Sequence, residues 1–206
     1  MDPMPTNPDL RLPVLLGMLL ALAAGCTATI TPPRDVDDPV NVLLLEHGRS
    51  TSLVVPRDGA VVRYAYGEYG HYALYRRNVL SAMRALFVPS RAAIGRRVID
   101  VPMDPARVRE SLVVQTEGSH VIRVERASVE RLRDELDALF TAQASARVEN
   151  AALDMTFVPH PSPYLLLSNS NHEVGRWLHA LDCDVRPWPI VRRWGVAEPQ
   201  AANASR

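Results

Sequence analysis

Two short polar segments of the sequence carry side chains suited to nucleophilic hydrolysis. Residues 168–172 (SNSNH) lie between an apolar run and an amphipathic helical pattern, and residues 47–52 (HGRSTS) follow an apolar run of strand character. A helix N-terminus presents free N–H groups and a positive dipole end, which lower the pKa of a nucleophile and stabilise an oxyanion. A serine there, facing a histidine on a neighbouring strand, would have the arrangement of an amide or ester hydrolase.

The candidate nucleophile is Ser170, and three histidines could serve as its base. A serine hydroxyl has a far higher pKa than a thiol, so it needs a base within hydrogen-bond reach. His47 follows a predicted strand, His71 lies in an aromatic loop, and His172 comes just after Ser170 in the predicted helix. The catalytic hypothesis pairs Ser170 with His47, and the spacing leaves the other two histidines open.

The same residues also have a structural explanation. Serine and asparagine side chains accept hydrogen bonds from the unpaired N–H groups of a helix start, so residues 168–171 are typical of a helix cap. We prefer capping for this segment. Two alternatives stand beside it: a reactive Ser170, and a degenerate site that still binds a ligand. The binding residues of that degenerate site would be Asn171, His172, Tyr69 and His71.

Hydrophobic periodicity predicts an α+β domain, with helices packed on a mainly antiparallel sheet. Strands are expected over residues 41–46, 52–56, 60–66, 96–101, 120–125, 153–158 and 164–167, with a turn at 57–59. Helices are expected over 74–87, from Pro105, from a cap at Ser128, and over 171–182, where Val174, Trp177, Leu178 and Leu181 form an apolar stripe.

The order of these segments resembles an uncharacterised bacterial domain family with the motifs H-G-W-H-T-G-[IV], F-G-W-G-D-x-x-F-Y and T-C-N-T-W. The corresponding stretches are residues 47–53, 66–72 and 169–173. That family is similar to circularly permuted papain-like hydrolases of the NlpC type, and the resemblance implies the same fold here. In this alignment Ser170 replaces the nucleophilic cysteine and Ser50 replaces a histidine of the first motif. The resemblance therefore implies a domain that has lost catalysis and kept a cleft.

The N-terminus is typical of an export signal. Residues 12–25 form a short apolar run preceded by Arg11, and small residues lead directly into Cys26 (LAAGC). The run is too short to span a bilayer core of ~30 Å comfortably. It resembles the bacterial lipobox, in which the cysteine is acylated and becomes the new N-terminus. An uncleaved anchor helix is the alternative. Thr27, in place of an aspartate, favours the outer membrane.

Composition excludes several classes of function. The chain has 23 acidic and 23 basic residues, all the latter arginine and scattered, so we expect no nucleic-acid partner. No metal motif, G-x-S-x-G elbow or phosphate-binding glycine loop occurs, so we expect no metal and no cofactor. If Cys26 carries lipid, Cys183 has no intramolecular partner and the exported domain stands without a disulfide.

The sequence thus predicts a signal peptide at 1–25, a lipidated cysteine and tether at 26–39, one domain at 40–196 and a disordered tail at 197–206. The leading hypothesis is a palmitoylated lipoprotein of the bacterial cell envelope, on the periplasmic face of the outer membrane, that binds an envelope ligand or protein through a degenerate papain-like cleft. One alternative is an active hydrolase using Ser170. A purely structural envelope component is the other.

Overall fold

The computed structural model describes residues 26–48, 50–74, 89–165, 169–187 and 191–197. Seven strands form an antiparallel sheet in the order β6-β2-β3-β4-β5-β8-β7, and three more form a small sheet in the order β10-β1-β9. The only parallel pair among the described strands is β1 with β10. The expected α+β class with mainly antiparallel pairing is confirmed.

The large sheet comprises β2 (Pro39–His47), β3 (Ser50–Arg57), β4 (Ala60–Glu68), β5 (Ser90–Ile99), β6 (Gly118–Glu125), β7 (Val148–Asn150) and β8 (Met155–Tyr164). The small sheet comprises β1 (Cys26–Thr31), β9 (Asp184–Arg186) and β10 (Val191–Val196). The helices are α2 (Tyr69–Tyr72), α4 (Pro105–Glu110), α5 (Arg126–Ala142), α6 (Ser170–Ala180) and the 3-10 turn η2 (Ala144–Ala146).

The β3–β4 hairpin shows how local sequence sets the register of the sheet. Asp58 and Gly59 form its two-residue loop with positive φ values of 34° and 83°. A two-residue hairpin with both φ values positive suits the twist of the strands, and Asp-Gly is a preferred pair for it. The turn predicted at residues 57–59 is confirmed, and it sets Val55 opposite Val62.

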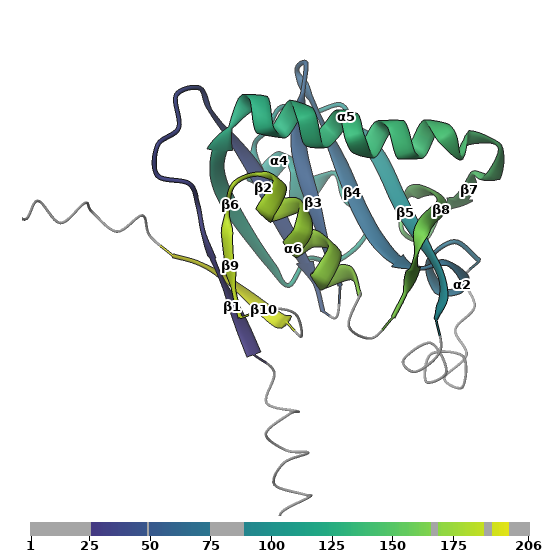
Figure 1. The fold of residues 1–206 in the computed structure, drawn as a ribbon. Coiled ribbons are helices and arrows are strands. Elements are labelled where there is room, and N and C mark those ends of the chain that lie inside the picture. The colour runs from purple at the N-terminus through teal and green to yellow at the C-terminus, as the bar shows by residue number, and fades with distance from the viewer. Residues whose placement is uncertain (1–25, 49, 75–88, 166–168, 188–190, 198–206) are drawn as a thin grey trace, which may run out of the picture.

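Alternation along the strands divides the large sheet into two faces. The first face carries Leu44, Leu53 and Tyr64, which join one large apolar cluster with α5, α6 and the small sheet. Figure 1 shows α5 and α6 lying across this face. The second face carries two smaller apolar clusters, one around Leu45 and Val54 and one around Phe157. Since side chains alternate between faces, neighbouring residues of a strand belong to different sites.

The α6 stripe of Val174, Trp177, Leu178 and Leu181 is buried in the first-face cluster, as predicted. Other boundaries differ. β5 begins earlier than the expected strand at 96–101 and ends at Ile99, because residues 90–95 pair with both β4 and β8. The expected strand at 164–167 begins where β8 ends, and its residues 166 and 167 lie outside the described residues. The expected helix at 74–87 also lies almost entirely outside them.

Ser128 does not cap α5. The helix starts earlier, at Arg126, and its N-cap residue is Glu125. Ser128 lies inside the first turn, where its hydroxyl donates to Asp182 at 2.9 Å and accepts from Arg131 at 3.1 Å. The prediction failed because a carboxylate distant in sequence supplies the serine with a partner.

The segment expected to be a tether is partly strand. Residues 26–31 form β1, in which Ala28 and Ile30 are fully buried while Thr27 and Thr29 are exposed. Alternating burial is typical of a strand, but the polar composition of the segment gave no indication of it in the sequence. At the other end, Ala197 donates its N–H to the Ile30 carbonyl, and the expected tail from 198 onward lies outside the described residues.

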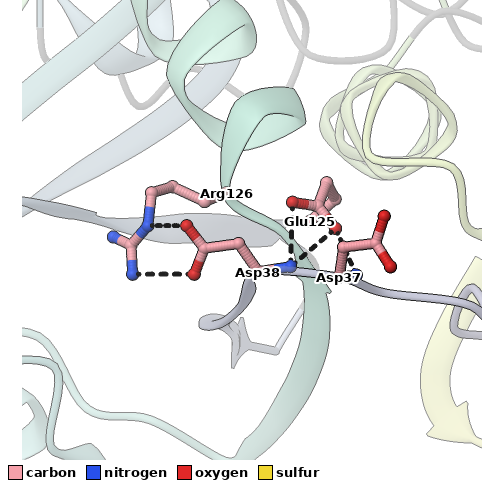
Figure 2. Close-up of polar contacts among 4 residues, drawn as sticks. All are labelled: Asp37, Asp38, Glu125 and Arg126. Atoms are coloured by element: carbon pink, nitrogen blue, oxygen red, sulfur yellow. Dashed lines mark hydrogen bonds and ion pairs between the residues drawn. The ribbon is translucent and has the colours of Figure 1, made fainter.

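Hydrogen bonds and an ion pair hold the connector between β1 and β2 against the junction of β6 and α5. Glu125 accepts from the N–H groups of Asp37 and Asp38, and Arg126 forms a two-point ion pair with the Asp38 carboxylate (Figure 2). The nearer Arg126–Asp38 contact is 2.7 Å. The hydrogen bond with Asp38 raises the pKa of Arg126. Glu125 thereby holds the chain entering β2 instead of capping α5 with its side chain.

Burial of β1 can be tested by paired substitutions on its two sides. Ile30→Ala removes a fully buried side chain, and we expect it to lower the free energy of unfolding by about 2–5 kcal/mol. Thr29→Ala, on the exposed side of the strand, should change it by less than about 0.5 kcal/mol. Urea unfolding followed by circular dichroism measures both. Equal effects of the two substitutions would contradict a buried β1.

Candidate ligand-binding site

A polar band crosses the second face of the large sheet and separates its two apolar clusters. Strand pairing builds it: Ser52 lies opposite Leu45 and Ala65, and Arg63 lies opposite Val54 and Arg97. Ser52 has no exposed surface, and Arg63 is 3% exposed. Polar groups this deeply buried require hydrogen-bond partners, so the contacts within the band decide what each can do.

His47, Ser52 and Arg63 form a compact hydrogen-bonded group. The His47 Nε2 lies 2.9 Å from the Ser52 Oγ and 3.1 Å from the Arg63 Nη2. A guanidinium can only donate, so the Nε2 is an acceptor and the imidazole is neutral. The His47 Nδ1 donates to the Gln115 carbonyl at 3.0 Å. Burial and the neighbouring Arg63 charge lower the pKa of His47 to about 4, which agrees with the neutral form.

Arg63 has two of its three nitrogens occupied. Its Nε donates to the Ser52 Oγ at 3.0 Å and its Nη2 to His47, while its buried Nη1 has no hydrogen-bond partner among the described residues. No carboxylate within the described part of the chain forms an ion pair with it. Burial and Arg97 lower the pKa of Arg63 to about 10, so it remains a cation at neutral pH.

The Arg63 group borders a cavity of about 40 Å³, which we call the Arg63 pocket. Its polar lining residues are His47, Ser50, Thr51, Arg63 and Tyr72. Its apolar lining residues are Ala65, Val114, Leu153, Met155 and Phe157. Ser52 does not line the pocket. The pocket therefore joins one buried cation and three hydroxyl-bearing residues to an apolar wall.

Two glycines make room for the aromatic walls. A Cβ at Gly67 would collide with the Tyr72 ring, and one at Gly95 would collide with the Phe157 ring. The rings therefore lie directly on the sheet. Burial raises the pKa of Tyr72, opposed by a hydrogen bond with Ser50 and by the Arg63 charge. Tyr72 is therefore a neutral phenol in the lining of the Arg63 pocket.

Ser170 begins α6, as predicted, and the capping interpretation of its segment is confirmed. Asn169 is the N-cap, and its side chain accepts from the N–H groups of Asn171 and His172, both at 3.0 Å. Ser170 is buried, and no hydrogen bond within the described part of the chain joins its hydroxyl to a histidine. Residue 168 lies outside that part.

His47 and α6 belong to different faces of the sheet. His47 follows the alternation of Leu43 and Leu45 on the second face, whereas α6 packs Val174 and Leu178 into the first-face cluster. The residue of β3 that contacts α6 is Thr51, whose hydroxyl donates to the Asn171 side chain at 2.9 Å. The structure therefore pairs His47 with Ser52 and not with Ser170.

The other expected binding residues do not gather in one cleft. Tyr69 packs near the Phe157 cluster, with the Arg91 guanidinium 4.7 Å above its ring. His71 is exposed and meets the Tyr72 ring edge to face. Asn171 and His172 lie on α6, against the first face. Of the expected site residues, only His47 lines the Arg63 pocket.

Sequence reasoning missed Ser52, Arg63 and Tyr72 as site residues. Arg63 lies within the strand VVRYAY at the same parity as Val61 and Ala65, so alternation alone places its charge inside. A charged residue at a buried strand position is the signal that could have identified it. The pairing of Arg63 with Ser52 and His47 depends on register across three strands, which the sequence does not state.

A larger open hollow of about 1000 Å³ lies beside β5, β7 and the end of α5. Two arginines that line it are already neutralised, since Arg96 pairs with Asp137 at 3.1 Å and Arg97 with Asp154 at 2.7 Å. The third, Arg147, is exposed to solvent. The Arg63 pocket differs because its cation is buried and has no ion-pair partner among the described residues. We therefore take the Arg63 pocket as the candidate site.

Within the described ranges, no three His, Cys, Asp or Glu side chains cluster closely enough to hold a metal ion. None of the described helices is both long and apolar enough to cross a membrane. Cys183 is buried in the first-face cluster, and burial raises the pKa of its thiol to about 12. Comparisons of the chain with protein-family models, with curated proteins and with solved structures found no match.

The lowered pKa of His47 predicts a specific pH dependence of stability. At pH values between about 4 and the ordinary histidine pKa of 6.5, His47 is protonated in the unfolded chain and neutral in the folded chain. Stability from neutral His47 is therefore complete above pH 6.5 and is lost as the pH falls toward 4. His47→Gln removes this contribution, so the stability difference between wild type and variant should shrink from pH 7 to pH 4.

Urea unfolding at pH 7, 5.5 and 4 measures that difference. The remaining histidines are common to both proteins, so their contributions cancel. A difference that stays constant over this range would contradict a half-buried, neutral His47.

Proposed function

We propose that this chain is a lipid-anchored protein of the bacterial envelope that binds a ligand through an anionic group in the Arg63 pocket, without catalysing a reaction. The observation that carries the proposal is the buried Arg63 cation, which lines the cavity and whose Nη1 has no hydrogen-bond partner among the described residues. A buried charge that lacks a partner is costly, and an anion in the pocket would remove that cost.

The arrangement around Ser52 supports binding over catalysis. Ser52, His47 and the Gln115 carbonyl have the spacing of a nucleophile, a base and an orienting group. However, Ser52 is fully buried and does not line the pocket, so a substrate in the pocket cannot reach its hydroxyl. In this proposal Ser52 and His47 position Arg63 so that its Nη1 is the nitrogen left for a ligand.

The proposed location rests on the sequence around Cys26. The LAAGC segment supports lipidation at that cysteine, and Thr27 supports the periplasmic face of the outer membrane. The permuted papain-like relationship also belongs to the proposal. It is supported by the three motif-like segments and by a helix that begins at Ser170, where the similar family carries its cysteine.

Replacement of the cation tests the binding function. In the wild-type protein, a small anion at 100 times its Kd should add about 2.7 kcal/mol to the free energy of unfolding. Arg63→Met should abolish this gain, because the cation is gone while Ser52 and His47 still bond to each other. Thermal unfolding with acetate, phosphate or sulfate, against chloride at equal ionic strength, measures it.

Arg123→Met is the matched control, since Arg123 is an exposed arginine on the edge strand β6. Arg63→Lys gives a second variant that keeps the charge but loses the planar fork, and it should bind more weakly than wild type. A wild-type protein that none of these anions stabilises would contradict the binding function.

The anchor is tested separately by metabolic labelling with a palmitate analogue in a bacterial host. Wild-type protein should incorporate the label and partition with membranes, because two or three acyl chains bury many methylene groups at about 0.8 kcal/mol each. Cys26→Ala should lose the label, whereas Cys183→Ala should retain it. Label that persists in Cys26→Ala would refute lipidation at that residue.

A further inference from the structure

We infer that the outer face of the small sheet lies against anionic phospholipid headgroups and sets the orientation of the domain on the membrane. This outer face consists of Thr27, Thr29, Arg186, Arg193 and Gly195. The inference rests on the part of the proposed function that places a lipid on Cys26. It concerns a surface separate from the Arg63 pocket.

The anchor residue and the small sheet are continuous. β1 begins at Cys26, where the sequence predicted a tether. Along β1, Thr27 lies opposite Arg193 and Thr29 lies opposite Arg186. Since a strand rises about 3.3 Å per residue, the first pair lies roughly 3 Å along the strand from the anchor and the second roughly 10 Å. An acylated Cys26 would therefore hold both pairs close to the headgroup layer.

The small sheet has one apolar face and one polar face. Its inner face buries Ile30, Val185 and Trp194 in the first-face cluster, so the sheet is fixed to the body of the domain. Residues paired across neighbouring strands point to the same side, so Arg186 and Arg193 share the outer face with the exposed threonines. The small sheet lies at the side of the domain that carries β6 (Figure 1). The outer face can therefore meet a flat surface while the domain stays behind it.

The charges of the outer face are arranged by distance from the anchor. The two arginines lie opposite Thr27 and Thr29, whereas Asp184 lies opposite Thr31, at the far end of β1. Asp184 contacts Arg186 at 2.9 Å, but the two side chains are 50% and 82% exposed. An ion pair so exposed is weak, so it does not hold Arg186 away from a lipid phosphate. Each arginine at an anionic membrane surface favours contact by a factor of roughly five.

The composition of the outer face fits a headgroup layer better than a protein partner. Protein interfaces are centred on buried aromatic or aliphatic side chains, and the large apolar side chains exposed in the described ranges lie outside the small sheet. Arginine and threonine instead donate hydrogen bonds to phosphate oxygens. Because β1 continues directly from the anchor, the domain can turn only about Cys26. The two arginines favour the orientation that brings the outer face to the lipid.

The test measures how fast p-hydroxyphenylglyoxal modifies single arginines in the full-length lipidated chain in vesicles. Mass spectrometry gives the rate at each position on phosphatidylcholine vesicles and on a three-to-one mixture with phosphatidylglycerol. Arg186 and Arg193 should react roughly fivefold more slowly on the anionic vesicles. Arg109 and Arg147 are exposed arginines on other elements, and their rates should be equal on both. The protection should vanish in about 1 M sodium chloride, where the screening length is about 3 Å.

Thr29→Glu tests the charge of the face without replacing an arginine. The added carboxylate should abolish the difference in rate between the two kinds of vesicle. Gln143→Glu is the matched control, because it makes the same charge change at an exposed position at the end of α5 and should leave the protection unchanged. Thermal unfolding shows whether each variant is folded. Arg193→Gln offers a second variant, in which Arg186 should lose protection because the neighbouring cation is gone.

The outcomes separate this inference from the proposed function. If the host does not acylate Cys26, the anchor part of the proposed function fails. Coupling of the Cys26 thiol to a maleimide-bearing lipid then still tests the outer face, because Cys183 is buried and its thiol has a raised pKa.

Equal rates on the two kinds of vesicle, with either lipid on Cys26, would overturn the orientation inference and leave lipidation and anion binding standing. Protection that depends on protein concentration and not on phosphatidylglycerol would assign the outer face to a second copy of the chain. That result would also overturn the inference.

Discussion

The burial of the Arg63 charge is the constraint on which the second face of the sheet depends. A guanidinium with 3% exposure must be held by hydrogen bonds, and the chain supplies two of them from strands on one side of Arg63. His47 can accept one of these bonds only while it is neutral. The polar band, the histidine tautomer and the separation of the two apolar clusters therefore follow from one charged side chain.

The first face has the opposite character. It is covered by α5, α6 and the small sheet, which together bury a continuous apolar cluster. Among its polar groups is Asp137, which accepts from the Tyr64 hydroxyl at 2.7 Å and pairs with Arg96. The larger apolar cluster lies on this face, whereas the other face carries the Arg63 cation.

Hydrophobic periodicity and composition predicted the α+β class, the core strands, the turn at 57–59 and the apolar stripe of α6. These features could be predicted because they depend on residues close together in the sequence. The role of Ser128 and the strand nature of residues 26–31 were missed, since each is decided by a partner far along the chain. The site was missed for the same reason. His47 was identified as chemically interesting, but only strand register shows that it faces Ser52 and Arg63 and not the start of α6.

The pairing of β1 with β9 and β10 has a consequence for how the chain matures. β1 begins at Cys26, and its hydrogen-bonded partners are residues 184–186 and 191–196, near the other end of the chain. Contacts between residues so far apart in sequence form slowly, because a long loop must close before they gain stability. During synthesis, the first strand of the domain has no partner until the last strands have emerged. Thr27, Ala28, Thr29 and Ile30 would then form an unpaired strand edge, and the acyl chain proposed for Cys26 would hold that edge at a membrane surface while the remainder of the sheet assembles.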